Sequence, residues 1–314
     1  MQSRKLLQGH MAALFTIFLW GTTFISTKVL LQDFQPLEIL FSRFLLGFIV
    51  LWLLRPQRLH LTWPQRRIFI CAGISGITLY FLLENFALKY TTASNAAVIT
   101  TCIPFITAML AQKFLQGERL HKSFFLGFLF ALAGIVCIVF NGRSLMLNPL
   151  GDFLTIMAVC VWGFYSVFSK IIGSYNFNVL QSTRVIFGWG LLFMLPFLFV
   201  FDTSFKTACY LKPVNMGNLL FLGLGASAAC FVTWNYAVKT IGATKTAAYI
   251  YLSPLITVLT AHIVLAEPLT PLLWTGMLLT LAGLLLSENE QGLLAQIIHK
   301  LTQSNKNKGG HQDE

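Results

Sequence analysis

Long apolar stretches alternate with short polar connectors along almost the whole chain. Ten of these stretches are about 20 residues long, the length that an α-helix needs to cross the hydrocarbon core of a bilayer. Five lie in each half of the chain, and their centres fall near Trp20, Leu46, Thr78, Cys102, Ala131, Val161, Phe187, Ser227, Thr257 and Leu278. The pattern predicts an all-α integral membrane protein with ten transmembrane helices.

The two halves of the chain are related by an internal repeat. Asn85–Pro104 matches Asn235–Pro254 at an offset of 150 residues, with six identities in twenty positions, where roughly one or two would arise by chance. With small gaps the match reaches Trp20 and Trp162 upstream. We therefore predict repeats at 11–141 and 150–288, followed by a polar cytoplasmic tail at 289–314. Since each repeat has an odd number of spans, the second is inverted relative to the first, giving a 5+5 inverted repeat.

The composition supports a membrane protein and sets its orientation. Hydrophobic residues make up 56% and charged residues 11% of the chain, whereas soluble domains carry about 25% charged residues. With a cytoplasmic N-terminus, fifteen Lys and Arg fall on cytoplasmic segments and five on outer loops. This asymmetry predicts cytoplasmic N- and C-termini and explains the net charge of +11 without a nucleic-acid partner. The six cysteines are irregularly spaced, and we expect no disulfide framework, metal or cofactor.

Polar and aromatic side chains share one face of the first span and of its counterpart in the second repeat. At helical spacing these are Thr16, Trp20, Thr23 and Thr27 in the first span, and Trp162, Tyr165 and Ser169 in the sixth. In lipid such a face turns toward the protein interior or a wet cavity. The alternative is that the hydroxyl groups bond back to their own helix and the tryptophans pack between helices.

The third span carries Glu84, the only carboxylate well inside an apolar stretch, on one face with Gly73, Gly76 and Tyr80. Such an acid can carry a proton in exchange for substrate or hold a substrate amino group. It can also simply reach water, because it lies about one turn from the end of the span. Its repeat counterpart is Trp234, so the acid is not part of the shared scaffold.

The related arginines Arg43 and Arg184, in the second and seventh spans, lie within two turns of a span end. We expect them to extend toward the interface rather than to bind substrate.

Pro104 and Pro254 fall near the middle of the fourth and ninth spans, where each removes a backbone donor and interrupts its helix. Interrupted helices at matching positions of two repeats indicate the midplane site of a transporter. Beside them lie the polar residues Asn95, Thr100, Thr101, Tyr249, Tyr251 and Ser253.

The fifth and tenth spans are almost wholly apolar and carry the matched glycines Gly127 and Gly134, and Gly276 and Gly283. Their spacing lets another helix backbone come close, as in a scaffold or a dimer surface. A monomer and a homodimer therefore both remain possible.

The repeated Trp-Gly in the first span of each half, the prolines in the fourth and ninth spans, and a Glu before each Gly-rich last span (Glu118 and Glu267) resemble the EamA family of the drug/metabolite transporter superfamily. The resemblance covers about 11–288. It implies a bacterial inner-membrane carrier, commonly an exporter of amino acids, related metabolites or drugs. It also implies a central cavity lined by the first, third, fourth, sixth, eighth and ninth spans.

These observations predict a secondary transporter that moves a small, partly apolar metabolite, with export of an amino acid or related compound as the first interpretation. The expected substrate-binding residues are Trp20, Thr23, Tyr80, Glu84, Asn95, Trp162, Tyr165, Trp234 and Tyr249, and Glu84 is the expected proton-coupling group. An uptake carrier or a passive exchanger would have the same scaffold. A channel would show a selectivity filter, and a membrane enzyme would show paired carboxylates or a nucleophile with its base; neither pattern is visible.

Overall fold

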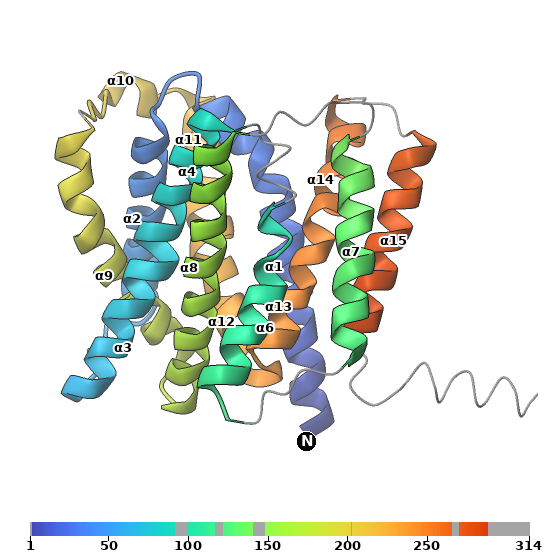
Figure 1. Ribbon diagram of the computed structural model, residues 1–314. Helices are drawn as coiled ribbons and strands as arrows, with labels where there is room; N and C mark the ends of the chain where they lie inside the picture. The colour runs from blue at the N-terminus through green and yellow to red at the C-terminus, as the bar shows by residue number, and fades with distance from the viewer. Residues whose placement is uncertain are drawn as a thin grey trace, which may run out of the picture.

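The computed structural model describes residues 2–91, 99–116, 122–140, 148–201, 203–265 and 270–287, and in these ranges the regular structure is helical throughout. Figure 1 shows long helices that run side by side along one direction. They are α1 (Gln2–Leu30), α2 (Pro36–Leu54), α3 (Trp63–Gly73), η1 (Ile74–Leu79), α4 (Tyr80–Tyr90), α6 (Ile103–Phe114), α7 (Lys122–Phe140), α8 (Pro149–Ser174), α9 (Val179–Val200), α10 (Thr207–Tyr210), α11 (Pro213–Leu220), η2 (Phe221–Ala229), α12 (Cys230–Ile241), α13 (Ala243–Ala248), η3 (Tyr249–Leu252), α14 (Ser253–Leu265) and α15 (Pro271–Ser287).

Five helices of the described chain are long and apolar enough to cross a membrane, and they are Pro36–Leu54, Trp63–Ala87, Pro149–Ser174, Val179–Val200 and Pro213–Ile241. The all-helical membrane class is thus confirmed, but the count of ten spans is not. Two further apolar helices, Ser123–Ile138 and Pro271–Ser287, are shorter. The segments that contain Pro104 and Pro254 are interrupted, so within their described residues no single helix reaches the length of a span.

Helix starts follow from local sequence. Pro36, Pro149 and Pro213 each occupy the first position of a helix, where a residue without a backbone N–H loses nothing. The side chain of Asn148 accepts from the N–H of Gly151 at 3.1 Å, which caps α8. Asn178 caps α9 in the same way. The short connectors therefore place successive long helices side by side.

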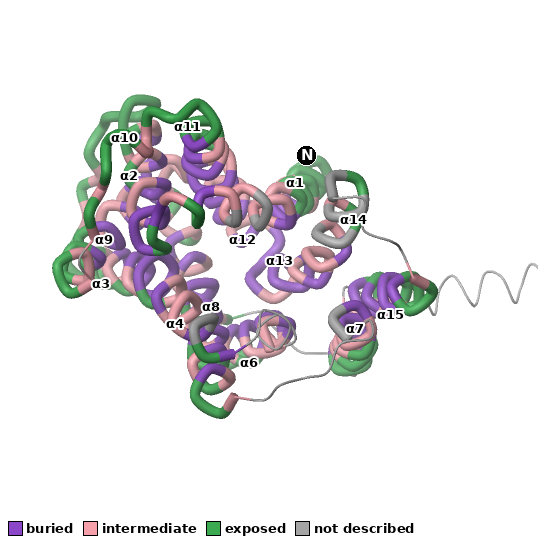
Figure 2. The backbone as a smooth tube through the Cα atoms, turned by 90° about the horizontal axis from the view of Figure 1, so that it is seen from above, coloured by how far each residue is buried: buried purple, intermediate pink, exposed green. Residues whose placement is uncertain are grey.

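Apolar side chains cover much of the outside of the bundle. Phe199 is 82% exposed and Ile263 is 80% exposed, and many other Leu and Phe side chains are also exposed. Figure 2 shows the buried positions turned toward neighbouring helices. Such a surface is unfavourable in water but matches lipid tails. The exposure pattern therefore belongs to a protein that crosses the membrane several times.

The helices α7 and α15 form a close pair, and Figures 1 and 2 both show them side by side. A Cβ added to Gly134 would lie 2.5 Å from the carbonyl oxygen of Gly276, and one added to Gly276 would lie 2.6 Å from that of Gly134. Gly127 and Gly283 meet in the same reciprocal way. The glycine spacing predicted a close backbone contact, and the structure shows that the two helices of this chain satisfy it together.

The third and eighth predicted spans each contain a π-helical segment, η1 and η2. A π-helical segment shifts the hydrogen-bond ladder by one residue and is frequent at functional sites. In η2 the carbonyl of Ala226 accepts from the indole N–H of Trp20 at 2.9 Å, so the shifted ladder contacts α1. The apolar pattern along the chain does not indicate either segment.

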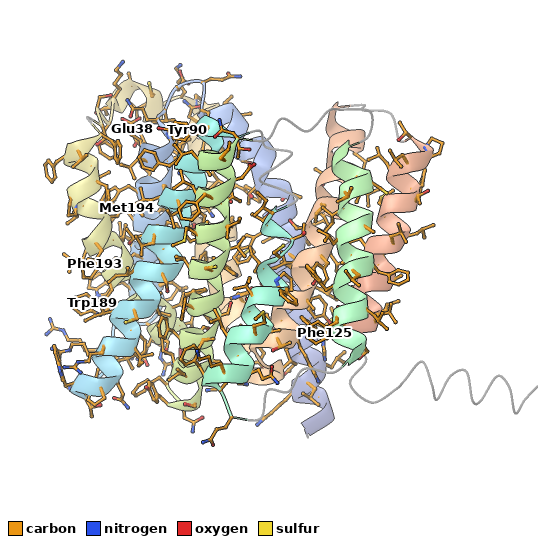
Figure 3. All side chains as sticks on the ribbon, in the orientation of Figure 1. Glu38, Tyr90, Phe125, Trp189, Phe193 and Met194 are labelled. Atoms are coloured by element: carbon orange, nitrogen blue, oxygen red, sulfur yellow. The ribbon has the colours of Figure 1, made fainter. Side chains whose placement is uncertain are left out.

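At the end of the bundle that is uppermost in Figure 1, polar contacts join the start of α2 to the segment that follows α9. One carboxylate oxygen of Glu38 accepts from the backbone N–H groups of Ser204 at 2.7 Å and Phe205 at 3.0 Å. Figure 3 shows Glu38 at this end. Beside it lies a polar cavity of about 260 Å³, lined by residues of the α1–α2 turn together with Glu38, Ser204 and Lys206. Asp33 also lines this cavity and forms an ion pair with Lys212 at 2.7 Å.

The Asp33–Lys212 pair predicts a pH dependence of stability. The hydrogen bond from Lys212 holds the pKa of Asp33 below its ordinary value, and the hydrogen bond to Asp33 raises the pKa of Lys212. A lowered carboxyl pKa stabilises the folded state above the unfolded value of about 4, and this stabilisation is lost as the pH falls through the lowered value. A raised ammonium pKa stabilises the folded state below the unfolded value of about 10, and this stabilisation is lost as the pH rises through the raised value.

We therefore expect Asp33→Asn to lower the melting temperature of the purified protein slightly at pH 7, because the pair is exposed and screened by salt. The difference from wild type should shrink as the pH falls below about 4 and through the lowered pKa of Asp33. A thermal melt of both proteins from pH 3 to pH 9 measures this. A difference that stayed constant down to pH 3 would show that the charge of Asp33 is not its cause.

Candidate substrate site

Six aromatic side chains from four helices meet in the interior, and we call them the aromatic cluster: Trp20, Tyr80, Trp162, Tyr165, Phe231 and Trp234. Trp162 lies at its centre, with ring centroids 4.7 Å from Tyr80, 5.1 Å from Tyr165 and 5.6 Å from Trp20. Trp20 lies 5.2 Å from Trp234. Five of the nine predicted substrate-binding residues are therefore brought together, from α1, α4, α8 and α12. Phe231 was missed, since a phenylalanine in an apolar helix carries no polar signal.

Two indole N–H groups in the cluster have no partner. Trp162 is 3% exposed and Trp234 is fully buried, and neither Nε1 forms a hydrogen bond. Trp20, by contrast, donates to Ala226. Buried donors are normally satisfied, and an orphaned one in a native structure calls for a partner such as a ligand or water. Two buried donors among aromatic rings suit a partly apolar solute with hydrogen-bond acceptors.

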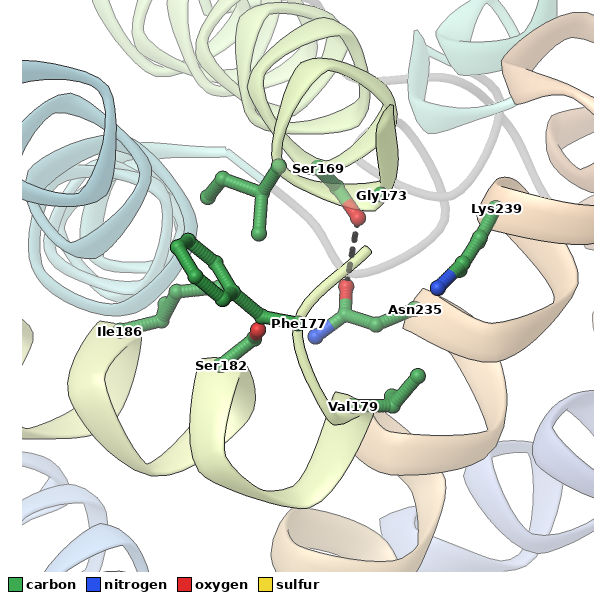
Figure 4. Close-up of a pocket in the computed structure, with 9 residues that line it drawn as sticks. Ser169, Gly173, Phe177, Val179, Ser182, Ile186, Asn235 and Lys239 are labelled. Carbon is green, nitrogen blue, oxygen red and sulfur yellow. Dashed lines mark hydrogen bonds between the residues drawn. The ribbon is translucent and has the colours of Figure 1, made fainter. Parts of the chain in front are cut away.

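A polar network supports the cluster from the side nearer the N-terminus of α1. The hydroxyl groups of Tyr165 and Ser169 donate to Oδ1 of Asn235 at 2.8 and 2.7 Å, and the Asn235 amide donates to Thr183 at 3.0 Å. Figure 4 shows the Ser169–Asn235 bond beside a small cavity. That cavity has a volume of only about 10 Å³, about enough for a single water and too small for a metabolite. Tyr165 is thus held by hydrogen bonds, and its ring rather than its hydroxyl faces the cluster.

Glu84 and Arg43 lie beside the cluster. The Tyr80 hydroxyl donates to Oε1 of Glu84 at 3.1 Å. Arg43 is 8% exposed, donates from Nε to the Ser227 hydroxyl at 2.8 Å, and lies over the ring of Phe81 at 5.6 Å. The charges of Arg43 and Glu84 attract each other, but in the described chain the salt bridge is between Lys212 and Asp33 and none joins these two.

The expectation that Arg43 extends to the interface is therefore wrong, because its guanidinium is held inside the bundle by η2. Arg184 differs. It donates to the backbone carbonyls of Arg55 and Gln57 just beyond the end of α2.

The remaining predicted residues lie elsewhere or use their polar atoms locally. Thr23 donates to the carbonyl of Trp20 at 2.7 Å, so its hydroxyl bonds back to its own helix. Tyr249 is paired through its hydroxyl with Nδ1 of His10 at 2.7 Å, ten residues before Trp20 on α1 and therefore about 15 Å from it along the helix. Asn95 lies outside the described residues.

The two prolines stand at the start of resumed helices. Pro104 is the second residue of α6, after a turn at Thr101 and Cys102. Pro254 is the second residue of α14, after the 3₁₀ turn η3. Two buried hydroxyls near these interruptions, those of Thr107 and Tyr251, lack hydrogen-bond partners.

A family model described as the EamA-like transporter family matches this chain twice, at residues 7–140 and 149–288. The chain belongs to the EamA-like transporter family. The family, the buried centre and the apolar exterior together make it a multi-pass membrane protein of the drug/metabolite transporter type, which acts on a small-molecule substrate.

Relatives of this EamA protein extend over nearly its whole length. An uncharacterized transporter of Archaeoglobus fulgidus is 30% identical, over 90% of this chain and 98% of its own. A probable terminal-alkyne amino-acid exporter of Streptantibioticus cattleyicolor is 27% identical, over 90% of this chain and 94% of its own. A probable amino-acid metabolite efflux pump of Escherichia coli is 26% identical, over 87% of this chain and 92% of its own.

A solved crystal structure shares the fold with this EamA protein. Its TM-score is 0.74 at 21% identity, and the match covers 94% of this chain and 99% of the other. In the described part of the EamA chain, no three His, Cys, Asp or Glu side chains are grouped as a metal site would require.

Proposed function

We propose that this EamA protein is a secondary transporter that exports an amino acid or a related metabolite across the bacterial inner membrane by alternating access. The observation that carries the proposal is the aromatic cluster with its two unpartnered indole donors beside the half-buried Glu84. Aromatic rings bind an apolar side chain, and the indole donors bind an acceptor group. Two relatives, a probable terminal-alkyne amino-acid exporter and a probable amino-acid metabolite efflux pump, support the same substrate class.

Alternating access rests on the proposed architecture of ten spans in two inverted repeats, 11–141 and 150–288. Three matched features support it: the double match of the family model, the π-helical segments η1 and η2, and the helices resumed at Pro104 and Pro254. The Lys and Arg distribution supports cytoplasmic termini and a cytoplasmic tail at 289–314. Such repeats present one midplane site to either side by rocking against each other.

Within this proposal the cluster residues Trp20, Tyr80, Trp162, Tyr165 and Trp234 line the substrate path. Glu84 takes up or releases a proton as substrate moves, because a lone acid inside a membrane protein serves such relays. Asn95, Thr23 and Tyr249 are secondary candidates on the same path. We propose no enzymatic activity, cofactor or nucleic-acid partner, and either a monomer or a homodimer suffices.

The test is counterflow in proteoliposomes that contain the full chain and are preloaded with a mixture of the twenty amino acids. We expect saturable exchange of at least one neutral amino acid and accumulation when a pH gradient is imposed. Glu84→Gln is expected to abolish the accumulation driven by the pH gradient and to retain exchange. The glutamine amide keeps the size of the side chain and the hydrogen bond from Tyr80, but it has no titratable proton.

The possible results separate the parts of the proposal. Exchange that ignores both the gradient and Glu84→Gln would make the protein a passive exchanger and would remove Glu84 as the coupling group. Uptake-directed accumulation under the physiological gradient would reverse the proposed direction. No exchange of any amino acid would overturn the substrate class.

A further inference from the structure

We propose that Arg43 binds the carboxylate of the transported substrate. The inference rests on the proposed amino-acid transport and adds the group that recognises the acid end of the molecule. It concerns a residue whose position in the sequence suggested only an interfacial role.

Arg43 is buried and incompletely satisfied. Its side chain lies inside the bundle at 8% exposure, and its one hydrogen bond runs from Nε to the Ser227 hydroxyl. Among the described residues, both terminal Nη groups lack a hydrogen-bond partner, and the guanidinium lies over the rings of Phe44 and Phe81 at 5.3 and 5.6 Å. A buried guanidinium is unfavourable unless its donors are used, so these open donors indicate a site for an anionic acceptor.

Glu84 does not fill that site. One of its oxygens accepts from Tyr80, and it attracts Arg43 without forming an ion pair in the described structure. The other groups that face Arg43 are the neutral Ser227 hydroxyl and the Cys230 thiol. A substrate carboxylate beside Arg43 would replace Glu84 as the nearest negative charge. This would leave Glu84 available to exchange its proton.

A series of ring contacts joins Arg43 to the aromatic cluster. Phe81 lies under the guanidinium, its ring is 4.9 Å from Tyr80, and Tyr80 is 4.7 Å from Trp162. A small amino acid with its carboxylate on Arg43 would thus lay its side chain against Tyr80 and Trp162. The forked donors of arginine match the two oxygens of a carboxylate, which an amide group cannot replace.

The repeat supplies a natural control. Arg184 occupies the position equivalent to Arg43, but its terminal nitrogens donate to the carbonyls of Arg55 and Gln57. These donors are already used to join α9 to the end of α2. Arg184 is therefore a structural arginine, while Arg43 has the same chemistry with its terminal Nη donors free.

The experiment compares binding of L-leucine and L-leucinamide, which lacks the carboxylate charge. Ligand-dependent rises in melting temperature of the purified full chain give the two affinities without interference from leakage across vesicles. The same pair is built from another amino acid if counterflow selects one. We expect wild type to prefer leucine by at least about tenfold, which is a modest value for a charge-assisted bidentate pair.

Arg43→Gln is expected to reduce this preference to about one while leaving leucinamide binding nearly unchanged. Arg184→Gln is expected to keep the preference even where it lowers the melting temperature. Arg43→Lys retains the charge without the fork and should keep part of the preference, so it serves if Arg43→Gln does not fold.

Equal losses for leucine and leucinamide in Arg43→Gln would make Arg43 a purely structural link between α2 and η2 and would overturn the proposal. A wild type without preference would do the same. Absence of counterflow for every amino acid would instead overturn the proposed function. Intact counterflow without carboxylate preference would overturn only the role of Arg43.

Discussion

Trp162→Ala is expected to lower the rate of amino-acid exchange at least about tenfold. Trp162 contacts five rings of the aromatic cluster, and each such aromatic pair contributes about 0.5–1.5 kcal/mol. Loss of about 1.4 kcal/mol from the transport-competent state already corresponds to a tenfold reduction. The variant should still insert into the membrane, because one substitution changes the hydropathy of α8 only slightly. Counterflow at matched protein levels measures the effect.

Two further variants serve as controls for this prediction. Trp162→Phe keeps a ring at the centre but removes the unpartnered indole N–H, so it should lose less than Trp162→Ala. Thr22→Val should stay within about twofold of wild type, because the Thr22 hydroxyl bonds to the carbonyl of Leu19 in its own helix and one such bond has a small net value. Exchange unchanged in Trp162→Ala would remove the cluster from the substrate path.

Gly76→Leu is expected to destabilise the fold strongly and to abolish transport. A Cβ on Gly76 would lie 2.2 Å from Cδ2 of Tyr165, which is far inside van der Waals contact. Overpacking of this kind costs about 1–3 kcal/mol, and a displaced Tyr165 also loses its hydrogen bond to Asn235, worth about 1 kcal/mol. The melting temperature of the purified protein and its elution as a single species measure the loss.

Gly217→Leu is the matched control, since a Cβ on Gly217 would meet nothing within 4 Å. It lies in α11 and should melt close to wild type. Equal destabilisation by both substitutions would show that glycine itself, rather than the approach of Tyr165 to η1, matters at these sites.

Much of the site could be predicted because side chains with polar groups, including those of Trp and Tyr, are uncommon within membrane-spanning helices and tend to face the protein interior where they occur. Trp20, Tyr80, Trp162 and Trp234 were visible for that reason, and the structure brings them together. Phe231 was not visible, since phenylalanine is as common facing lipid as facing the interior. Tyr249 looked equivalent to the others but pairs with His10, because its helix is interrupted and turned at η3.

The two arginines show most clearly what could not be predicted from the sequence. In the sequence Arg43 and Arg184 are the same residue at matched positions of a repeat, and both were expected at an interface. Their difference arises from their neighbours. Arg184 meets backbone carbonyls at the end of α2, whereas Arg43 meets a serine of η2 and two phenylalanine rings.

The sequence by itself determined the helical membrane class, the repeat and the glycines that allow close helix contacts. These follow from the length, period and identity of residues along one chain. Only the tertiary structure decided that Gly134 meets Gly276, that η1 and η2 depart from α-helical bonding, and that Arg43 keeps both of its terminal Nη groups open beside Glu84. Periodicity gives the direction of a side chain around its own helix, but the partner it meets depends on the packing of helices far apart in the chain.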